Sequence, residues 1–358
     1  MTPADILLVG PADKKTGGIA YYIKNQQNYL SEHLDCDIFD VSTSDGSGLQ
    51  WFVTACLEAL RDMVGFVRRS PPQLVHIHSS QDLSFYLSSF YILFVSYAWQ
   101  RPVVLHIHGP SFDEFVMTSS QPLFYFQQFV LNRCDNVIVL SEYWKKTLEL
   151  RLNKEKLCIV PNAVNPANFS PRTSFSVQQV VFLADTIQRK GLKEFIEAIT
   201  TLNGRENLQF RVAIAGTGPL SSLADELAEE YQNIQYHGYI SEEQKYRLLS
   251  SSSIYVLPSH ADGLPISLLE AMAGGNAIVT TPVGSIPNLI DGENGRIVSV
   301  DDTNELIDTL ESLLTSPQIV EQMSEENIRE VQKSYTWQQT VQDLMEIYQQ
   351  FLNNTPKT

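Results

Sequence analysis

Short apolar runs alternate with longer stretches of mixed polarity over most of the chain. The runs cover residues 6–9, 74–77, 103–107 and 137–140 in the first half, and residues 180–183, 210–215, 254–257 and 277–280 in the second. Turn residues bound each run, and helical stretches lie between the runs. Such runs predict strands that are buried on both faces, and hence parallel sheets covered by helices.

A segment rich in Pro, Asn and Ser, residues 160–172, separates the two sets of predicted strands. This composition is typical of a linker. We therefore expect an α/β protein of two Rossmann-like, doubly wound domains, residues 1–168 and 169–333. Ligands of such sheets bind beyond the carboxyl ends of the strands, so the loops at 10–18, 215–219 and 259–265 are expected to line one cleft between the domains.

Three further segments have a helical pattern. Residues 83–99 and 115–131 are strongly apolar, and the first of them carries no formal charge. Seventeen residues is about the minimum that spans a bilayer, and a crossover helix is required between the flanking strands, so we expect buried or interfacial helices. Residues 334–352 space their apolar side chains three or four apart, which predicts an amphipathic helix that packs back on the first domain.

Length, charge and cysteine usage narrow the class of protein. The 358 residues correspond to about two domains. The net charge is −16, of which −3 falls in residues 1–168 and −13 in the rest, and this opposes nucleic-acid binding. Four cysteines without CxxC spacing predict a reducing, cytoplasmic compartment. No charged segment precedes the short first apolar run, so we expect no export signal.

The segment of residues 258–275 carries the most chemistry, and it reads PSHADGLPISLLEAMAGG. It predicts a strand end, a loop, and a helix with Pro265 in its first turn. The free N–H groups of Ile266 and Ser267 at the start of that helix favour a phosphate. Glu270, one turn further on, can accept hydrogen bonds from a ribose diol, and Asp262 can meet sugar hydroxyls. Spacing alone equally allows Asp262 as a helix N-cap and Glu270 as a surface residue.

These residues also resemble a known family, the retaining GT-B glycosyltransferases of the family-4 type (glycosyl transferases group 1). The family signature is an acidic residue, seven residues, then Glu followed by Ala-Met-Ala, and Asp262 and Glu270 match that spacing. Further matches follow in order along nearly the whole chain: Gly17-Gly18, Val75-His76-Ile77-His78, Leu105-His106-Ile107-His108-Gly109, Val139-Leu140-Ser141-Glu142, Val160-Pro161-Asn162-Ala163-Val164, Arg189-Lys190-Gly191, Ala215-Gly216-Thr217-Gly218-Pro219 and His237-Gly238.

The resemblance implies the GT-B fold, with the sugar donor on the second domain and the acceptor on the first. It implies roles for His108, Lys190, Asp262 and Glu270 in catalysis. Residues implied to bind the nucleotide sugar are Gly17, Gly18, Arg189, Lys190, Gly216, Gly218, Ile240, Gly263, Leu264, Ile266, Ser267 and Glu270. It also implies sugar transfer with retained configuration, usually without a bound metal and with no cofactor besides the nucleotide sugar.

Two positions depart from the family pattern. The first signature acid is usually Glu, and Asp262 is one methylene shorter. The family usually has an Arg five residues before the Lys of the Arg-Lys-Gly motif, where it clamps the diphosphate, and this chain has Asp185. A carboxylate repels phosphate, so Lys190 and Arg189 are left to hold the diphosphate.

Four histidines form two H-x-H pairs on neighbouring predicted strands, His76 with His78 and His106 with His108. Grouped imidazoles can bind zinc, and strand alternation places each pair on one face. The sequence suggests no further acidic or Cys ligand nearby. We therefore expect no metal, with His108 in the cleft and the other three in the core or behind it.

The sequence thus predicts a glycosyltransferase that moves a sugar from a UDP-, GDP- or ADP-linked donor to a glycan or lipid-linked acceptor, as in cell-surface polysaccharide or glycoconjugate biosynthesis. Two alternatives stay open: a nucleotide-sugar 2-epimerase, and a non-catalytic partner of another glycosyltransferase subunit, which Asp185 favours. Aromatic-rich helices at 85–99 and 112–129 suggest peripheral attachment at the inner face of a membrane, and packing inside the domain is the alternative.

Overall fold

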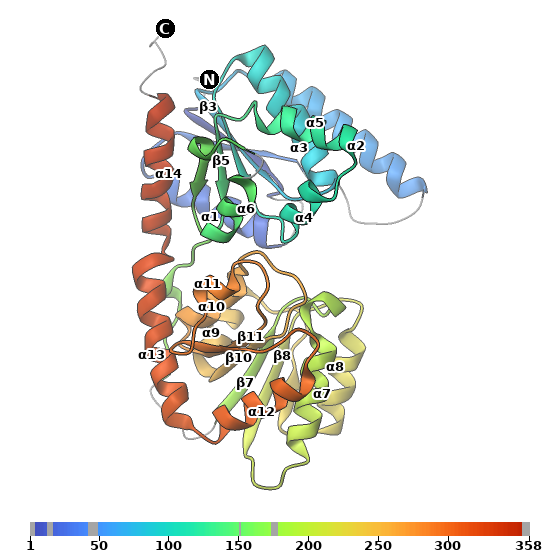
Figure 1. Cartoon of the computed structure of the whole chain (residues 1–358), viewed down its shortest axis with the longest axis vertical. Helices are drawn as coiled ribbons and strands as arrows, with labels where there is room; N and C mark the ends of the chain where they lie inside the picture. Colours follow the sequence, from blue (N-terminus) through green and yellow to red (C-terminus); the bar gives the residue numbers. More distant parts are fainter. Residues whose placement is uncertain (1–3, 13–16, 42–48, 150–151, 173–177, 353–358) are drawn as a thin grey trace. The chain divides into compact units, whose positions relative to one another are not determined.

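The computed structural model describes residues 4–12, 17–41, 49–149, 152–172 and 178–352, without the side chains of 49–53 and 113. The chain forms two compact units, Met1–Asn162 with Trp337–Thr358, and Ala163–Thr336. The first boundary between them, after residue 162, falls inside the linker segment predicted from composition. Each unit has a six-stranded parallel sheet with helices against it (Figure 1). The predicted fold class is confirmed.

The first unit has the strand order β2-β1-β3-β4-β5-β6. Its strands are β1 (Ile6–Gly10), β2 (Cys36–Asp40), β3 (Leu74–Ser79), β4 (Val103–Ile107), β5 (Asn136–Val139) and β6 (Leu157–Ile159). Its helices are α1 (Gly18–Leu30), α2 (Leu49–Val67), α3 (Leu83–Phe94), α4 (Phe112–Met117), α5 (Gln121–Leu131), α6 (Glu142–Glu149) and α14 (Trp337–Leu352), with a π-helical turn at Val95–Trp99 and a 3₁₀ turn at Lys154–Lys156.

The core of the first unit lies between its sheet and two helices that are far apart in the sequence. Alternate side chains of β1, β3 and β4, among them Leu8, Leu74 and Val104, pack against apolar residues of α1 and α14. This follows from strand geometry, because side chains two positions apart share a face. Leu344 and Tyr348 of α14 are fully buried in this core, so the last helix is an integral part of the unit.

The second unit has the strand order β12-β11-β10-β7-β8-β9. Its strands are β7 (Gln178–Leu183), β8 (Phe210–Ala215), β9 (Ile234–Tyr236), β10 (Ile254–Leu257), β11 (Ala277–Thr280) and β12 (Gly295–Ile297). Its helices are α7 (Leu192–Asn203), α8 (Ser221–Glu230), α9 (Glu242–Ser251), α10 (Ile266–Ala273), α11 (Ile286–Leu289), α12 (Thr303–Leu314) and α13 (Pro317–Ser334), with 3₁₀ turns at Pro166–Asn168 and Gln188–Lys190.

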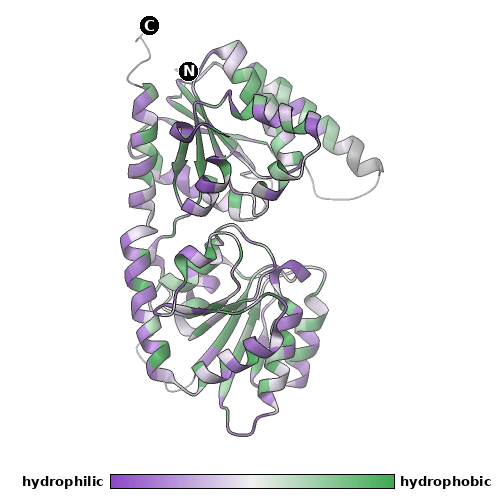
Figure 2. Cartoon of the chain, viewed as in Figure 1, coloured by the Kyte–Doolittle hydropathy of each residue, from purple (hydrophilic) through white to green (hydrophobic). Residues whose placement is uncertain are grey.

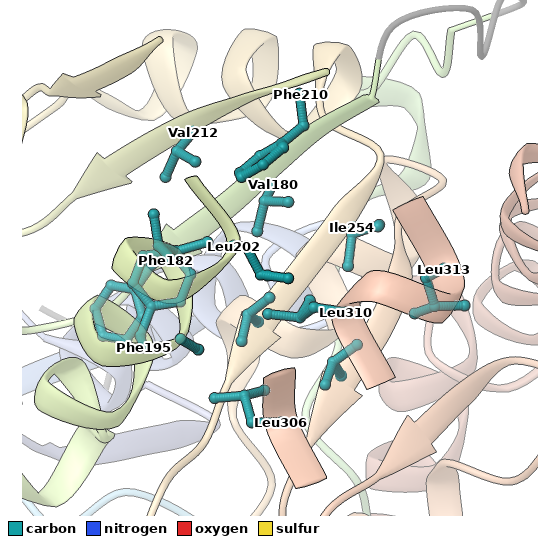
Figure 3. Packing of buried hydrophobic residues seen from close by; sticks show 14 of the residues in the cluster. Val180, Phe182, Phe195, Leu202, Phe210, Val212, Ile254, Leu306, Leu310 and Leu313 are labelled. Atoms are coloured by element: carbon teal, nitrogen blue, oxygen red, sulfur yellow. The ribbon is translucent and has the colours of Figure 1, made fainter. Parts of the chain in front are cut away.

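The core of the second unit fills the space between this sheet and helices α7 and α12. Val180, Phe182 and Ile254 point from the strands toward Phe195 of α7 and Leu310 of α12 (Figure 3). The alternate side chains of the same strands, such as Tyr255, lie on the other face of the sheet. Hydropathy follows the same plan, with green strands inside each unit and purple positions on the outer helices (Figure 2). Both faces of the sheet are thus covered, as the continuous apolar runs predict.

Two helix predictions need correction. The apolar stretch 115–131 is not one helix, because α4 ends at Met117 and α5 begins at Gln121, just before Pro122. Proline fits the first turn of a helix but not its interior, so the break falls there. The C-terminal helix begins at Trp337 rather than at residue 334, since Ser334 ends α13. No helix in the described part of the chain has the length and hydropathy needed to cross a bilayer.

Candidate active site

The start of α10 lies beyond the carboxyl end of β10. Pro265 is the N-cap, and no side chain caps the helix there, so the N–H groups at its first positions, Ile266 and Ser267, lack the partners that the helix interior provides. The Tyr255 hydroxyl lies 2.8 Å from Oγ of Ser267 and donates to the carbonyl of Leu183 at 3.2 Å, which ties this end of α10 to two central strands. An uncapped helix start of this kind favours an anion.

Asp262 is not a helix cap, and the capping alternative is wrong. Asp262 is 7% exposed, and its carboxylate accepts two hydrogen bonds from Nζ of Lys190, at 2.9 and 2.8 Å. Nη1 of Arg189 lies 3.8 Å from Oδ1 of the same carboxylate and donates to the carbonyl of Ala261. Asp262, Lys190 and Arg189 therefore lie close together. The sequence analysis selected them from two separate motifs.

A close backbone contact explains how Lys190 reaches Asp262. Residues Gln188–Lys190 form a 3₁₀ turn that ends at Gly191, whose φ of +75° is in the left-handed region. A Cβ on Gly191 would lie 2.0 Å from the carbonyl oxygen of Pro258. The amide of His260 in turn donates to the carbonyl of Arg189 at 2.8 Å. Glycine is needed here because any side chain would push the turn away from the end of β10.

Glu270 is buried and forms an ion pair with a residue that the sequence analysis did not select. Glu270 is 2% exposed, and its Oε1 lies 2.6 Å from Nζ of Lys245 in α9. The same Nζ lies 2.9 Å from the carboxylate of Glu242. Burial raises the pKa of the Glu270 carboxyl to about 7, although the charge of Lys245 acts to lower it. Burial lowers the pKa of Lys245, but the charges of Glu270 and Glu242 more than offset this, so its pKa is raised. The alternative of Glu270 as a surface residue is wrong.

The loop after β8 packs against the loop after β7. Gly216 has a φ of +130°, and a Cβ there would lie 1.8 Å from the carbonyl oxygen of Ala184. The amide of Gly216 donates to Gly238 at 2.8 Å, and the amide of Gly218 donates to Oγ of Ser221 at 3.0 Å. Asp185 lies exposed next to this contact, so its carboxylate does stand at the strand ends.

The remaining nucleotide-site candidates of the second unit border the same loops. Ile240 is half-buried and directly precedes the N-cap of α9, Ser241. Gly263 and Leu264 are buried, and the carbonyl of Gly263 accepts a hydrogen bond from the amide of Ser285 at 2.9 Å. The glycine before Ser285, Gly284, has a φ of +55°, and a Cβ on it would lie 1.9 Å from the carbonyl oxygen of Asp262. Gly284 therefore positions the Asp262 loop, which no sequence motif indicated.

The candidates of the first unit lie at the carboxyl ends of β1 and β4. Half-buried His108 follows β4, and its Nε2 lies 2.9 Å from Nδ1 of His78. Burial lowers the pKa of His108 to about 3, so its ring is neutral near pH 7. Gly17 and Gly18 are exposed at the start of α1. Gly17 has a φ of +153°, and no described atom lies within 4 Å of where its Cβ would be.

Sequence reasoning thus found most of the polar groups at the strand ends of the second unit, and it missed Lys245, Tyr255 and Gly284. Lys245 gave no signal, because a lysine in the first turns of a polar helix is typical of a solvent-exposed surface. Tyr255 is part of an apolar run, and only its hydroxyl makes the polar contact. Gly284 precedes Ser285 in a turn that resembles many others.

Comparison with known proteins identifies the family. The family described as "Glycosyltransferase Family 4" matches residues 16–168, and "Glycosyl transferases group 1" matches residues 177–316. The chain belongs to the GT-B glycosyltransferases of these two groups. The expected family membership is therefore confirmed, and the two matches follow the two units of the fold.

The relatives of this glycosyltransferase are distant. It is 25% identical over 206 residues to the MMP alpha-(1->4)-mannosyltransferase of Mycolicibacterium hassiacum, over 56% of this chain and 50% of that protein. It is 27% identical over 197 residues to the putative colanic acid biosynthesis glycosyltransferase WcaL of Escherichia coli, over 51% of this chain and 48% of that one. The chain thus spans about half the length of these curated relatives.

A solved structure shares the fold over nearly the full length. HepE of Anabaena, solved in complex with UDP-glucose, superposes with a TM-score of 0.74, covering 96% of this chain and 99% of that one at 14% identity. Identity this low shows the fold and no more.

Proposed function

We propose that this protein is a retaining hexosyltransferase that moves a sugar from a nucleotide sugar to a hydroxyl of a glycan or lipid-linked acceptor. The observation that carries the proposal is the arrangement of two acids at the end of β10. Asp262 and Glu270 are both buried, and each is paired with a lysine from another element, Lys190 and Lys245. Buried, paired carboxylates beside an uncapped helix start are more than a folded domain needs for stability.

The nucleotide sugar binds at the strand ends of the second unit. The N–H groups of Ile266 and Ser267 and the cations of Lys190 and Arg189 hold the diphosphate, since fixed dipoles and charges favour an anion. The Glu270 carboxylate accepts hydrogen bonds from the two ribose hydroxyls, and the charge of Lys245 partly offsets the effect of burial on the pKa of that carboxyl. Gly216, Gly218 and Ile240 border the nucleoside, and Gly263 and Leu264 border the diphosphate. UDP is the first choice of leaving group, because HepE was solved with UDP-glucose.

Asp262 and Lys190 act together before and during transfer. In the free protein the carboxylate neutralises the Lys190 ammonium, at 2.8 Å. When the diphosphate binds, the ammonium gains a second anionic partner, and Asp262 is then available to the sugar hydroxyls. As the bond to the leaving group breaks, negative charge grows on the diphosphate and positive charge on the sugar. The negative charge on the diphosphate is stabilised by Lys190, Arg189 and the α10 amides. The positive charge on the sugar is stabilised by Asp262.

The acceptor hydroxyl attacks the face from which the nucleoside diphosphate leaves, so the configuration is retained. The bond from the sugar to the diphosphate breaks, the new glycosidic bond forms, and the proton of the hydroxyl passes to the leaving diphosphate oxygen. No side chain is assigned as a covalent nucleophile, because Asp262 and Glu270 are engaged by lysines. The developing charge is carried by these cations and amides, so the transfer requires no metal. His108 of the first unit contacts the acceptor, and a neutral imidazole suits a hydrogen bond to a hydroxyl. Gly17 and Gly18 leave room for ligand atoms close to the backbone.

The acceptor is proposed to be membrane-linked, because helix α2 carries an exposed apolar stripe. Leu57, Leu60, Val64 and Val67 are 62%, 59%, 41% and 43% exposed, and their spacing of three and four places them on one face. Arg61 and Arg68 are exposed on α2 and directly after it, Arg61 lies 3.4 Å from the carboxylate of Asp62, and Glu58 and Asp62 are half-buried. An apolar stripe with exposed cations suits an anionic lipid surface. The protein thus acts in the cytoplasm at the inner face of a membrane, in cell-surface polysaccharide or glycoconjugate synthesis.

Flotation with anionic vesicles tests the membrane contact. The Leu57→Gln/Leu60→Gln variant is expected to stay with the soluble fraction while the unchanged chain floats. Ile319→Gln, at an exposed apolar position of the second unit, serves as the matched control and should float normally. Equal flotation of all three proteins would refute the contact through α2.

Calorimetric titration of the full chain with UDP, GDP and ADP tests the sugar-donor site. We expect micromolar binding of one nucleotide, lost in Glu270→Ala and kept in Glu243→Ala, which changes an exposed glutamate of α9. Product analysis with the matching nucleotide sugar then distinguishes transfer from 2-epimerisation. Transfer gives a new glycosidic product, whereas epimerisation gives a second nucleotide sugar.

Asp185 supports a second candidate, a non-catalytic GT-B subunit that works with a partner glycosyltransferase. This exposed carboxylate stands at the strand ends, where it repels a diphosphate. The second candidate predicts no binding of any nucleotide to the unchanged chain and a gain of binding in Asp185→Arg. Micromolar binding by the unchanged chain would exclude it.

A further inference from the structure

A small cluster of charged side chains lies between α9 and α10 of the second unit. Nζ of Lys245 in α9 lies 2.6 Å from Oε1 of Glu270 in α10. The same Nζ donates to Oε1 of Glu242, three residues earlier in α9, at 3.0 Å. One cation therefore lies between two carboxylates, which come from different helices.

The three side chains differ in exposure, and the difference indicates which contact is strong. The side chains of Lys245 and Glu270 are 13% and 3% exposed, whereas that of Glu242 is 55% exposed. Solvent weakens an exposed ion pair, so the contact with Glu242 contributes little. The pair with Glu270 lies almost out of water, where each charge is strongly destabilised if its partner is removed. Lys245 and Glu270 therefore depend on each other.

Neighbouring contacts fix the spacing of the two helices around the lysine. The side-chain amide of Asn276 donates to a carbonyl near the end of each helix, that of Leu249 in α9 at 2.9 Å and that of Ala271 in α10 at 2.8 Å. Within α9, the hydroxyl of Tyr246 donates to Oε2 of Glu242 at 2.9 Å and holds that carboxylate in place. The ammonium between the two helices is thus kept against α10.

We propose that Lys245 is a positioning residue for the nucleotide sugar, which orients the Glu270 carboxylate for the ribose and sets the pH range in which that carboxylate is ionised. The inference rests on the proposed function, in which Glu270 accepts hydrogen bonds from both ribose hydroxyls. An ionised carboxylate accepts hydrogen bonds at both oxygens, whereas a protonated carboxyl donates from one of them. Lys245 acts on the ligand through Glu270 and takes no part in breaking or forming the glycosidic bond.

The charges that act on Glu270 come from α9. Burial raises the pKa of its carboxyl to about 7, the charge of Lys245 lowers it, and the charge of Glu242 raises it. Of the other described elements packed against α10, β11 and the buried positions of α13 are uncharged. On β10, burial raises the pKa of the Tyr255 phenol, which therefore stays neutral. Asp262, in the loop before α10, already has a lysine as its partner.

The Lys245→Met variant tests the proposal through the pH dependence of UDP-glucose affinity, measured by titration calorimetry from pH 6 to 9. Without the nearby cation the pKa of Glu270 rises, so the midpoint of the profile should move up from about 7 by about 1–3 units. A rise of about one unit lowers the affinity at pH 7 about fivefold. Lys245→Arg keeps the charge and should keep the midpoint. Arg247→Met, which removes an exposed cation of the same helix, is the matched control and should change neither quantity.

Two further measurements separate this role from a merely structural one. Glu242→Gln changes an exposed side chain and is expected to fold, and loss of its charge should move the same midpoint below about 7, opposite to Lys245→Met. At pH 7, Lys245→Met should also weaken the binding of UDP more than that of 2′-deoxy-UDP, because the deoxy analogue lacks one hydroxyl that Glu270 contacts. A general distortion of the site would weaken both nucleotides equally at every pH.

The outcomes distinguish this inference from the proposed function. Absence of nucleotide binding from the unchanged chain overturns both. Binding by the unchanged chain, together with the same midpoint in Lys245→Met and in Glu242→Gln, overturns the role of Lys245 alone. If Lys245→Met does not fold, Glu242→Gln decides: a downward shift of its midpoint supports the role, and an unmoved midpoint overturns it.

Discussion

Asp262 has two partners in the proposed site. It binds a cation before the nucleotide sugar arrives, and it contacts the sugar afterwards. Its two hydrogen bonds to Lys190, in a place almost closed to solvent, hold the ammonium where the diphosphate is expected. The pair therefore has a cost for binding, because the carboxylate also repels the incoming phosphates. The two requirements, tight nucleotide binding and fast transfer, oppose each other at this residue.

The Asp262→Asn variant separates those two requirements. Removing the negative charge frees Lys190 for the diphosphate, so affinity for the nucleotide is expected to rise by about threefold or more, about 0.7 kcal/mol. Transfer is expected to fall by at least about a hundredfold, because the developing positive charge on the sugar loses its partner. Titration calorimetry and product formation measure the two effects. Asp225→Asn, at an exposed site of α8, serves as control, and weaker binding with unchanged transfer would contradict the proposed role.

Glu270 gives the site a pH dependence. Because burial raises its pKa to about 7, the carboxyl is largely protonated at pH 6 and ionised at pH 8. A protonated carboxyl cannot accept hydrogen bonds from both ribose hydroxyls, so affinity for the nucleotide sugar should fall as the pH drops through about 7. The nucleotide sugar is the right ligand, since its diphosphate has no group that titrates there. Calorimetry from pH 6 to 8.5 measures this, and Glu270→Gln should bind weakly with no such dependence. A pH-dependent affinity in that variant would assign the titration to another group.

At the level of elements, the central strands could be predicted and the edge strands could not. Runs such as 103–107 and 254–257 are apolar throughout because both faces of a central strand are buried. The edge strands β9 and β12 have three residues each, partly exposed, and their sequences lack such a run. An edge strand forms by pairing with a strand that is distant in sequence. The local pattern of apolar and polar residues therefore does not predict it.

The candidate site divides in the same way. The match to the family signature selects Asp262 and Glu270 as candidates, whereas their spacing alone leaves a cap and a surface position equally open. The partner of Glu270 could not be predicted, because Lys245 comes from α9 and meets the carboxylate only after the strands have assembled. The predicted anion-binding helix start and the Gly216 turn are local features of strand-to-helix connections, and these local features carried most of the prediction.

The loop that carries Asp262 depends on Gly284, which yields a prediction with a close control. In Gly284→Ala the left-handed φ costs about 1–2 kcal/mol, and the new Cβ meets the carbonyl oxygen of Asp262. We expect the Asp262 loop to shift and nucleotide-sugar affinity to fall at least about tenfold, which is about 1.4 kcal/mol. Gly292→Ala, where no described atom lies within 4 Å of the new Cβ, should change stability by less than about 0.5 kcal/mol and leave binding unchanged. Equal effects of both variants would show that the contact at Asp262 is unimportant.

For the whole molecule, the two units are joined by the chain but have separate cores. The core of the second unit is built from α7, α12 and their strands, whereas the core of the first includes α14 from the end of the chain. Each core is expected to melt as its own cooperative transition. A nucleotide that binds one unit should then stabilise only that unit.

Scanning calorimetry with and without nucleotide tests this separation. Leu310→Ala and Leu344→Ala, at fully buried positions of the second and first core, should each lower one transition, by about 2–5 kcal/mol in stability, and so assign the two. Nucleotide at 100 times its dissociation constant adds about 2.7 kcal/mol, which raises the affected transition by roughly 5–10 °C. The shift should appear in the transition lowered by Leu310→Ala, because the helix start proposed to bind the diphosphate and both paired acids belong to the second unit. A shift confined to the other transition would place the nucleotide on the first unit and refute the proposed site.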